Sequence, residues 1–472
     1  MPRDGKCVIH WFRRDLRLAD NTALSRASAS GLPVVPVHIL SEWKGEHSWT
    51  GSNRQQFLCD CLAELSSSLD AISGNLILRK GDPIRELEKL AKETGASAIY
   101  LNKDPDPHGK KTEELLRAFC QRSGIDFHTF DDVALHHPSE VLTQAGAPYK
   151  VFTPYSRNWL GLEKPAPVAK PSALNTPRGI RSLELPKVSH WKLDAPSADL
   201  IRAGEKAARL RMRRAIRERL ADYEKDRDFP ARDGTSRLSQ DLRFGLISIR
   251  TLYAESMAAR SEAKPAGKKG IDVFIKELAW REFYFAILHH FPEVLDVEFN
   301  PDWRGLWWAE PGKQFEAWKE GRTGFPIVDA GMRELLATGF MHNRVRMITA
   351  MFLTKDLHID WRLGESFFMQ HLTDGEIASN NGGWQWSAGT GADAAPYFRI
   401  QNPWSQAARY DADGAYIKRW VPELASVDAK KLHTPPKDGG SVAPGYPAPI
   451  VDHKAERERT LEIFKRHRAK RG

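Results

Sequence analysis

Residues 76–101 read LILRKGDPIRELEKLAKETGASAIYL, and this stretch predicts a β-strand, a helix and a second β-strand. Its two ends are short apolar runs, which are typical of buried strands. Between them, Asp82 and Pro83 are residue types that begin helices, and Gly95 is the type that ends one. Strand, helix and strand in this order predict two parallel strands joined by a helix that covers one face.

The same alternation extends over the first 132 residues. β-rich runs lie at residues 7–12, 33–40, 76–78, 98–101 and 125–130, with helix-like segments at 53–72, 83–94 and 111–122. Five strands alternating with helices predict a Rossmann-like parallel five-stranded sheet with helices on both faces. The chain contains neither G-x-G-x-x-G nor a Walker A sequence, so the usual fingerprints for dinucleotides and triphosphates are missing.

The rest of the chain has a different pattern. Residues 165–200 contain six prolines, which indicates an extended connector within residues 133–200. Helical patterns then dominate, at residues 207–223, 271–290, 326–337 and 345–353. We therefore predict an α/β domain over residues 1–132, an all-α domain over residues 201–453, and a basic helix or frayed tail over residues 454–472.

The composition is that of an ordinary folded protein. Of the 472 residues, 41% are apolar and 28% are charged, and no stretch reaches the roughly 18 uncharged apolar residues of a membrane span. The first 20 residues are too charged for a signal peptide, so we expect a cytoplasmic protein. The four cysteines lie in the first quarter of the chain and indicate neither a disulfide scaffold nor a metal site.

Charge and tryptophan content bear on function. The formal net charge is +9, and it is concentrated in residues 202–219, with a net +6, and residues 454–472, with a net +5. A basic segment can bind a polyanion, although a basic helix is often only solvated. Ten of the 15 tryptophans follow residue 279, and such rings either pack a core or stack on bases or a flat cofactor.

The segment KELAWREFY, residues 276–284, carries chemical groups at helical spacing. A helix places Glu277, Trp280, Arg281 and Tyr284 on one face, because they are three or four residues apart. That face offers a carboxylate, a broad ring and a guanidinium. An aromatic core stripe with one salt bridge explains the same pattern and, for this segment alone, is the simpler interpretation.

Two further segments are ambiguous. In MHNRVRM, residues 341–347, Asn343 and Met347 share a helix face and could bind the edge and ring of a base, but a helix start with solvated arginines explains the segment as well. In DGTSRLS, residues 233–239, hydroxyls and backbone N–H groups could hold a phosphate. Ser236 or Ser239 could equally cap a helix.

The segment DGEIASNNGGWQW, residues 374–386, is unusual for a core or a surface loop. Adjacent asparagines and glycines predict a backbone that turns tightly and approaches a ligand closely. Asp374 could accept a hydrogen bond from a buried N–H group, and two tryptophans are rare in an ordinary loop. We therefore predict a binding site here.

Taken together, these segments resemble the photolyase/cryptochrome family. The similarity runs from about residue 8 to about residue 422 and includes WFRRDLRLADNTAL, RDFPARDGTSRLS, TGFPIVDAGMREL, DWRLGESFF and DGEIASNNGGWQWSAGTGADAAPYFRIQNP. The resemblance implies an N-terminal α/β domain and an all-α C-terminal domain that binds FAD. It also implies a light-driven electron transfer that splits pyrimidine dimers flipped out of UV-damaged DNA.

The resemblance implies roles for individual residues. The implied FAD contacts are Tyr223, Thr235, Ser236, Leu238, Ser239, Arg281, Arg344, Asp374 and Asn380, the last of which lies opposite flavin N5. The implied pocket for the dimer consists of Glu277, Trp280, Asn343, Met347 and Trp386. The catalytic residues among these are Glu277, Asn343, Met347 and Asn380. The implied electron-transfer chain is Trp384, Trp361 and Trp308, with Trp307 as an alternative outer member.

Particular residues also favour one branch of the family. Asn343 and Met347 stand where (6-4) photolyases and animal cryptochromes have histidines, and Asn380 stands where plant cryptochromes usually have aspartate. No cysteine follows Cys120, whereas the iron–sulfur branch needs four. The best resemblance is to bacterial cyclobutane pyrimidine dimer photolyases. It implies an antenna pigment near Asn102, methenyltetrahydrofolate or alternatively a deazaflavin, and we expect a monomer.

Two other functions stay open from the sequence. One is a blue-light photoreceptor that signals through a partner and repairs nothing. The other is an α/β nucleotide-binding domain joined to a helical nucleic-acid module, with no flavin. A bound flavin argues against the second, and a repair assay separates the first from an enzyme.

Overall fold

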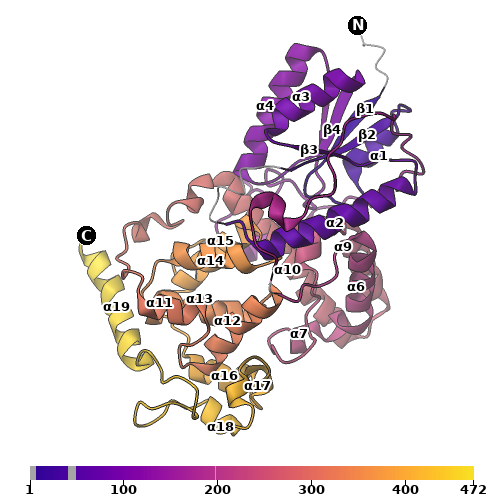
Figure 1. The fold of residues 1–472 in the computed structure, drawn as a ribbon. Helices are drawn as coiled ribbons and strands as arrows, with labels where there is room; N and C mark the ends of the chain where they lie inside the picture. Colours follow the sequence, from indigo (N-terminus) through magenta and orange to yellow (C-terminus); the bar gives the residue numbers. More distant parts are fainter. Residues whose placement is uncertain (1–6, 41–48, 197, 472) are drawn as a thin grey trace.

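The computed structural model describes residues 7–40, 49–196 and 198–471. An α/β half is built around one sheet, and the remaining chain forms a larger helical half beside it (Figure 1). Among the described residues, no helix is long and apolar enough to cross a membrane. Cys7, Cys59, Cys61 and Cys120 are free and buried.

The sheet confirms the predicted Rossmann-like arrangement. Its strands run parallel in the order β3-β2-β1-β4-β5. The elements are β1 (Val8–Phe12), α1 (Thr22–Ser28), β2 (Val34–Leu40), α2 (Ser52–Asp70), β3 (Ile77–Lys80), α3 (Pro83–Thr94), β4 (Ala98–Asn102), α4 (Pro107–Ser123) and β5 (Asp126–Phe130). Val8 and Phe12 pack with α1 and α2, whereas Ile9 and Trp11 pack with α3 and α4, so helices cover both faces.

The ends of α3 follow from the sequence. The Asp82 side chain accepts a hydrogen bond from the Arg85 N–H at 2.9 Å, which satisfies one of the free donors of the first turn. Pro83 occupies the first turn, where no N–H is needed. Gly95 ends the helix with φ of 65°, a left-handed conformation that favours glycine.

The connector after β5 is mostly irregular but includes one helix that the sequence did not predict, α5 (Phe152–Gly161). The proline-rich part returns to the sheet. Leu174 donates to the Ile72 carbonyl and accepts from the Val34 N–H, at 3.0 and 2.8 Å. Further along, the Asp199 N–H donates to the Ala337 carbonyl at 2.8 Å. The connector therefore contacts both halves.

The described residues after 200 form no β-strand, which confirms the all-α prediction. The helices are α6 (Glu205–Glu218), α7 (Tyr223–Asp226), α8 (Ser239–Arg243), α9 (Ile249–Glu262), α10 (Pro265–His290), α11 (Lys313–Lys319), α12 (Pro326–Thr338), α13 (Asn343–Met351), α14 (Trp361–His371), α15 (Ile377–Ala388), α16 (Pro403–Tyr410), α17 (Ala415–Trp420), α18 (Ala429–Leu432) and α19 (His453–Ala469). The basic C-terminal segment forms α19 rather than a frayed tail.

One predicted helix was wrong. Residues 207–223 do not form a continuous helix, because α6 ends at Glu218 and a 3-10 turn, Leu220–Asp222, follows. The backbone of this turn packs on α10 at Gly270, where a Cβ atom would lie 2.2 Å from the Ala221 carbonyl oxygen. Close packing of backbone on a glycine thus overrides the local helical pattern.

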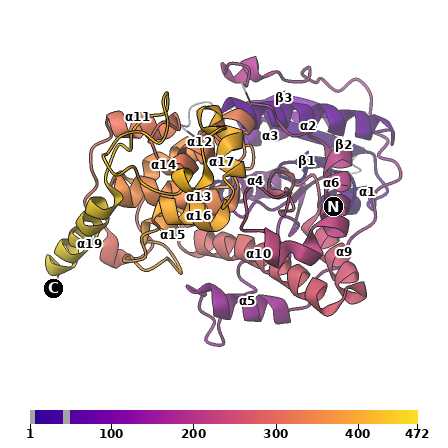
Figure 2. The same ribbon diagram turned by 90° about the horizontal axis from the view of Figure 1, so that it is seen from below.

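Helix α10 is central to the helical half. It packs against α5, α7, α9 and α15, and Figure 2 shows it running between α9 and α15 with α5 alongside. The predicted face with Glu277, Trp280 and Arg281 therefore lies on a helix whose position is fixed by several neighbours.

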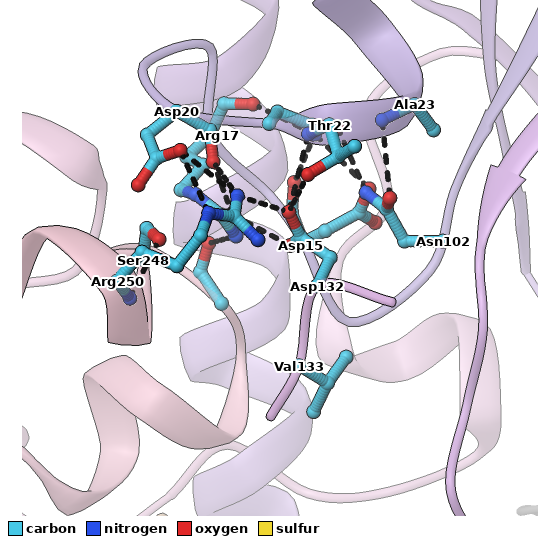
Figure 3. A network of polar contacts seen from close by, with 12 residues as sticks. Asp15, Arg17, Asp20, Thr22, Ala23, Asn102, Asp132, Val133, Ser248 and Arg250 are labelled. Carbon is cyan, nitrogen blue, oxygen red and sulfur yellow. Dashed lines mark hydrogen bonds and ion pairs between the residues drawn. The ribbon is translucent and has the colours of Figure 1, made fainter. Parts of the chain in front are cut away.

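A buried carboxylate joins the two halves. Asp132 follows β5 and accepts hydrogen bonds from the guanidinium groups of Arg17, at 2.6 Å, and Arg250, at 2.7 Å (Figure 3). Arg250 also binds the Asp20 carboxylate at 2.9 Å. Burial alone would raise the pKa of Asp132, but the two guanidinium groups lower it to about 2.

The residues after Asp132 position α10. The Val133 carbonyl accepts from Arg281 at 2.8 Å, and the Leu135 N–H donates to Glu282 at 2.6 Å. The Glu282 carboxylate is buried and also accepts from the Trp159 indole of α5 at 2.7 Å. The segment from 132 to 135 therefore ties the sheet, α5 and α10 together.

We predict that Asp132→Asn lowers the free energy of unfolding by about 3 kcal/mol at pH 7, because it leaves the buried Arg17 guanidinium without a carboxylate and Arg250 with Asp20 alone. Since the pKa of Asp132 is lowered to about 2 in the fold, its stabilisation is present above about pH 4 and is lost as the pH falls toward 2. Urea unfolding from pH 7 to 3 measures this. The control is Asp131→Asn, because Asp131 adjoins Asp132 in the sequence but its side chain is 39% exposed. Equal stability of the two variants at pH 7 contradicts the prediction.

Candidate active site

An ion pair links α13 to the segment before α15. Arg346 donates to one oxygen of Asp374 at 2.8 Å. The other oxygen, Oδ1, is buried and has no hydrogen-bond partner among the described residues. An unpaired buried carboxylate oxygen is costly, so this atom points to a missing donor from a ligand. Asp374 is among the residues predicted from the sequence, whereas Arg346 is not, although it lies in the same segment as Arg344.

The glycines of residues 374–386 do not form the predicted tight turn. That prediction was wrong, because Ile377–Ala388 is the helix α15. Gly382 is required by packing: a Cβ atom there would lie 2.1 Å from the Tyr284 ring of α10. Apart from the neighbouring backbone of α15, no heavy atom of the described residues lies within 4 Å of the Cβ position of Gly383, so this position borders open space. The close contact at Gly382 is with the Tyr284 ring, and the predicted approach to a ligand stays a prediction.

Two asparagines on α15 bind the buried Glu365 of α14. The Asn380 amide donates to the Glu365 carbonyl, and the Asn381 amide donates to the Glu365 carboxyl, both at 3.1 Å. Burial raises the pKa of Glu365 to about 8, so this carboxyl is largely protonated at neutral pH. The contact fixes the orientation of the Asn380 amide.

The loop before α8 brings a further cation to the site. Arg237 has φ of 55°, and its guanidinium lies 3.5 Å from the centroid of the Phe340 ring. Ser236 and Ser239 do not cap α8, because its N-cap is Leu238 without a side-chain hydrogen bond, so the capping alternative is wrong. Thr235 and Ser236 are half-buried and Ser239 is exposed. Tyr223 is buried and packs edge-on against Phe274 of α10, with centroids 5.4 Å apart.

Helix α10 supplies one wall of the candidate site. Glu277 forms an ion pair with Arg227, and burial raises its pKa although Arg227 opposes the shift. Trp280 stacks on Phe152 of α5, with centroids 3.6 Å apart and planes at 9°. One face of Trp280 is therefore covered, yet the residue is only half-buried. These ring contacts and the Glu277 ion pair also match the core-stripe interpretation, and the role of Trp280 in a binding site stays a prediction.

Arg281 lies apart from Glu277 and Trp280 in its contacts. Its guanidinium binds the Val133 carbonyl at 2.8 Å and lies 4.5 Å from the Phe285 ring. Burial lowers its pKa to about 10 despite the nearby Glu376 carboxylate. The structure thus places Arg281 at the junction of the two halves.

Helix α13 supplies a second wall. The exposed Asn343 amide lies 4.0 Å from the Met347 sulfur. Arg344 forms an ion pair with Asp228 at 2.7 Å and lies 4.5 Å from the Tyr410 ring. Since both Arg344 and Arg346 have carboxylate partners, the alternative of solvated arginines is wrong. Asp228 adjoins Arg227, so one dipeptide binds both walls.

The three tryptophans of the predicted electron chain lie on segments that contact one another. Trp384 is 2% exposed, and its ring lies against Gly364 of α14, where a Cβ atom would be 2.1 Å away. Trp361 begins the same helix one turn earlier. Trp308 is half-buried, and the next residue, Ala309, pairs with Ile359, two residues before Trp361. Trp307 is 50% exposed, and Trp386 is half-buried.

A cavity lies between the two halves. It has a volume of about 120 Å³ and is bordered by the carboxyl ends of β1 and β2, by the segment after β4 and by α8. Arg14 lines this cavity, and its guanidinium binds Asp104, at 2.9 Å, and Glu376. Ligands of open parallel sheets bind at this edge, near the point where the strand order reverses.

Comparison with known proteins identifies the class. The family model "DNA photolyase" matches residues 8–172, and "FAD binding domain of DNA photolyase" matches residues 274–466. A deoxyribodipyrimidine photo-lyase of Agrobacterium fabrum is 42% identical over 97% of both chains. The chain belongs to the DNA photolyase family. It is a photo-lyase enzyme with FAD as its cofactor.

Solved structures agree with this assignment. A class III photolyase from Agrobacterium tumefaciens is 40% identical, with a TM-score of 0.92 over 99% of this chain and 98% of its own. An archaeal photolyase from Sulfolobus tokodaii, solved with two FAD molecules, is 31% identical, with a TM-score of 0.84 over 97% of this chain and 99% of its own.

The residues of the site fit FAD. The unpaired Asp374 oxygen can accept from the N–H of a flavin ring, and the open space at Gly383 adjoins the same helix as Asn380. Arg237 and Arg344 bring positive charge suited to a diphosphate. The described residues contain no cluster of metal ligands.

We predict that Asp374→Asn raises the Kd for FAD about tenfold or more, because a charge-assisted hydrogen bond is worth about 1.5–3 kcal/mol. Flavin fluorescence on titration of the apoprotein measures the Kd. Asp60→Asn, at an exposed position of α2, is the matched control. Unchanged affinity in Asp374→Asn would remove this residue from the flavin site.

Proposed function

We propose that this enzyme uses light to split cyclobutane pyrimidine dimers in UV-damaged DNA. The observation that carries the proposal is the Arg227–Asp228 dipeptide, which pairs with Glu277 on α10 and Arg344 on α13. Two walls with a flat ring, a carboxyl and an amide thereby border the flavin-binding residues. Relatives that match nearly the full chain are named deoxyribodipyrimidine photo-lyases.

The residues divide the work of binding. Reduced FAD, excited by blue or near-UV light, supplies the electron and recovers it after the ring opens. Trp280 offers an apolar face for a flipped-out dimer, while its other face rests on Phe152. The Glu277 carboxylate, held by its ion pair with Arg227, can accept a hydrogen bond from a pyrimidine ring N–H. Asn343 donates to the base edge, and Met347 and Trp386 pack around it.

Asn380 and the absence of histidine complete the proposal. Asn380, held by the Glu365 carbonyl, presents its amide to the flavin. At Asn343 and Met347 this chain has no acid–base group, and simple ring opening needs none. A repair assay tests the proposal: a thymine-dimer oligonucleotide is repaired under blue light and not in the dark. A protein that binds FAD but repairs no dimer would instead be a photoreceptor of the cryptochrome kind.

The electron path and the antenna are part of the same proposal. We infer that Trp384, Trp361 and Trp308 carry electrons inward to oxidised flavin, with Trp308 outermost because it packs beside the start of α14. We infer that an antenna pigment, methenyltetrahydrofolate or alternatively a deazaflavin, binds across the mouth of the cavity at Arg14 and Asp104. Denaturing the purified protein and identifying the released pigment by mass spectrometry tests this inference. Basic helices such as α6 bind the phosphates of the DNA backbone. We also propose that the protein acts as a cytoplasmic monomer on single- or double-stranded DNA.

We predict that Trp280→Ala weakens binding of dimer-containing DNA about tenfold, since stacking on one base is worth about 1–3 kcal/mol. Glu277→Ala lowers the repair rate, and both variants keep FAD. Gel-shift Kd values and repair rates at limiting enzyme measure these effects. Glu262→Ala, at the exposed end of α9, is the control. Repair equal to wild type in both pocket variants contradicts the assigned pocket.

We predict that Trp384→Phe impairs photoreduction of oxidised flavin and spares repair by enzyme reduced beforehand. The reason is that phenylalanine fills the space beside Gly364 but is not readily oxidised. Bleaching of flavin absorbance under blue light with an external reductant measures the first effect. Equal rates in variant and wild type would take Trp384 off the path.

A further inference from the structure

Three buried tryptophans near the flavin site differ in what their indole N–H groups contact. The Trp384 N–H has no hydrogen-bond partner in the described part of the chain. The Trp318 N–H donates to the Thr349 carbonyl at 3.1 Å. The Trp361 N–H donates to the Glu298 carboxylate at 3.3 Å. Oxidation of an indole creates positive charge on the ring, so these partners set how well each ring holds that charge.

Trp384 has two tryptophan neighbours on different elements. Its ring meets the ring of Trp318, from α11, with centroids 6.1 Å apart and planes at 71°. It also packs on Gly364, one turn after Trp361 on α14. Trp318 is fully buried, whereas the path through Trp361 continues to the half-buried Trp308. An oxidised Trp384 could therefore draw an electron from a ring that leads outward or from one that is fully enclosed.

The charges around Trp361 oppose one another. The Arg362 guanidinium lies 4.4 Å from the centroid of the Trp361 ring and disfavours positive charge on it. That guanidinium is bound by two carboxylates, Glu298 and Asp360, each at 3.1 Å. Glu298 is only 3% exposed, so water screens its charge little. The ring of Trp361 thus faces one cation and two anions, with Glu298 bonded directly to its N–H.

We propose that Glu298 is a positioning residue that directs electron transfer through Trp361 rather than Trp318. The proposal rests on the inferred electron path. The Glu298 carboxylate stabilises one-electron-oxidised Trp361 in two ways. It accepts the hydrogen bond from the Trp361 N–H, and it neutralises the charge of Arg362. A charge-assisted hydrogen bond is about twice as strong as the carbonyl contact of Trp318, which favours oxidised Trp361 about tenfold over oxidised Trp318.

The electron count is simple. Trp384 gives one electron to the excited oxidised flavin and becomes a radical cation. Trp361 then gives one electron to Trp384, which is restored, and the positive charge now resides on Trp361. The Trp361 N–H proton stays on its nitrogen, in the hydrogen bond to Glu298. Trp308 then gives one electron to Trp361, and the external reductant finally gives one electron to Trp308.

The test is Glu298→Gln, which keeps the shape and a carbonyl acceptor but removes the charge. We expect photoreduction to fall several-fold, and transient absorption to show a shorter-lived tryptophan radical cation. Repair by enzyme reduced beforehand and FAD content should stay near wild type. Glu298→Asp, which keeps the carboxylate, should recover part of the yield.

Two further variants separate the possible explanations. Glu293→Gln removes a carboxylate that is 51% exposed and paired with Arg304, and we expect no effect on the radical lifetime. Trp318→Phe in the Glu298→Gln background should restore yield, because the enclosed alternative is gone. Wild-type radical kinetics in Glu298→Gln overturn this proposal. If Trp384→Phe also photoreduces normally, the electron path itself is wrong rather than the role of Glu298 alone.

Discussion

The two halves of the molecule meet at a buried carboxylate, Asp132, which lies between the guanidinium groups of Arg17 and Arg250. Such a charge is stable in the interior only when cations accompany it, so the sheet and the helical half must meet here in one geometry. The three residues that follow bind Arg281 and Glu282 of α10. The position of the helix with Glu277 and Trp280 is thereby coupled to the end of β5.

The candidate site uses paired charges in a similar way but leaves selected atoms unpaired. Arg346 and Asp374 neutralise one another, and the remaining Asp374 oxygen is available for a ligand. Arg227 neutralises Glu277 on one pocket wall, and Asp228 neutralises Arg344 on the other. DNA phosphates can compete for the two arginines. Among the described residues, the Trp384 indole N–H has no acceptor, whereas the Trp361 indole N–H donates to Glu298. Binding and electron transfer therefore both depend on which polar atoms are satisfied by the protein and which are not.

The sequence predicted the sheet well and the site in part. Strand positions and the ends of α3 follow from local patterns, since Asp82, Pro83 and Gly95 act within one helix. The stack of Phe152 on Trp280 and the Asp132 junction join residues more than a hundred positions apart, and no local period records them. Residues 374–386 show the limit most clearly. Glycine allows either a tight turn or close helix packing, and only the Tyr284 ring decides between them.

The central claim is that α10 and α13 bind a flipped-out dimer beside a flavin held by Asp374. A crystal structure of the protein with FAD and a duplex containing one thymine dimer tests it most directly. The account predicts the dimer outside the base stack, in contact with Trp280 and Glu277, and the flavin edge hydrogen-bonded to Asp374. A dimer still stacked in the duplex, or a flavin remote from Asp374, would contradict it.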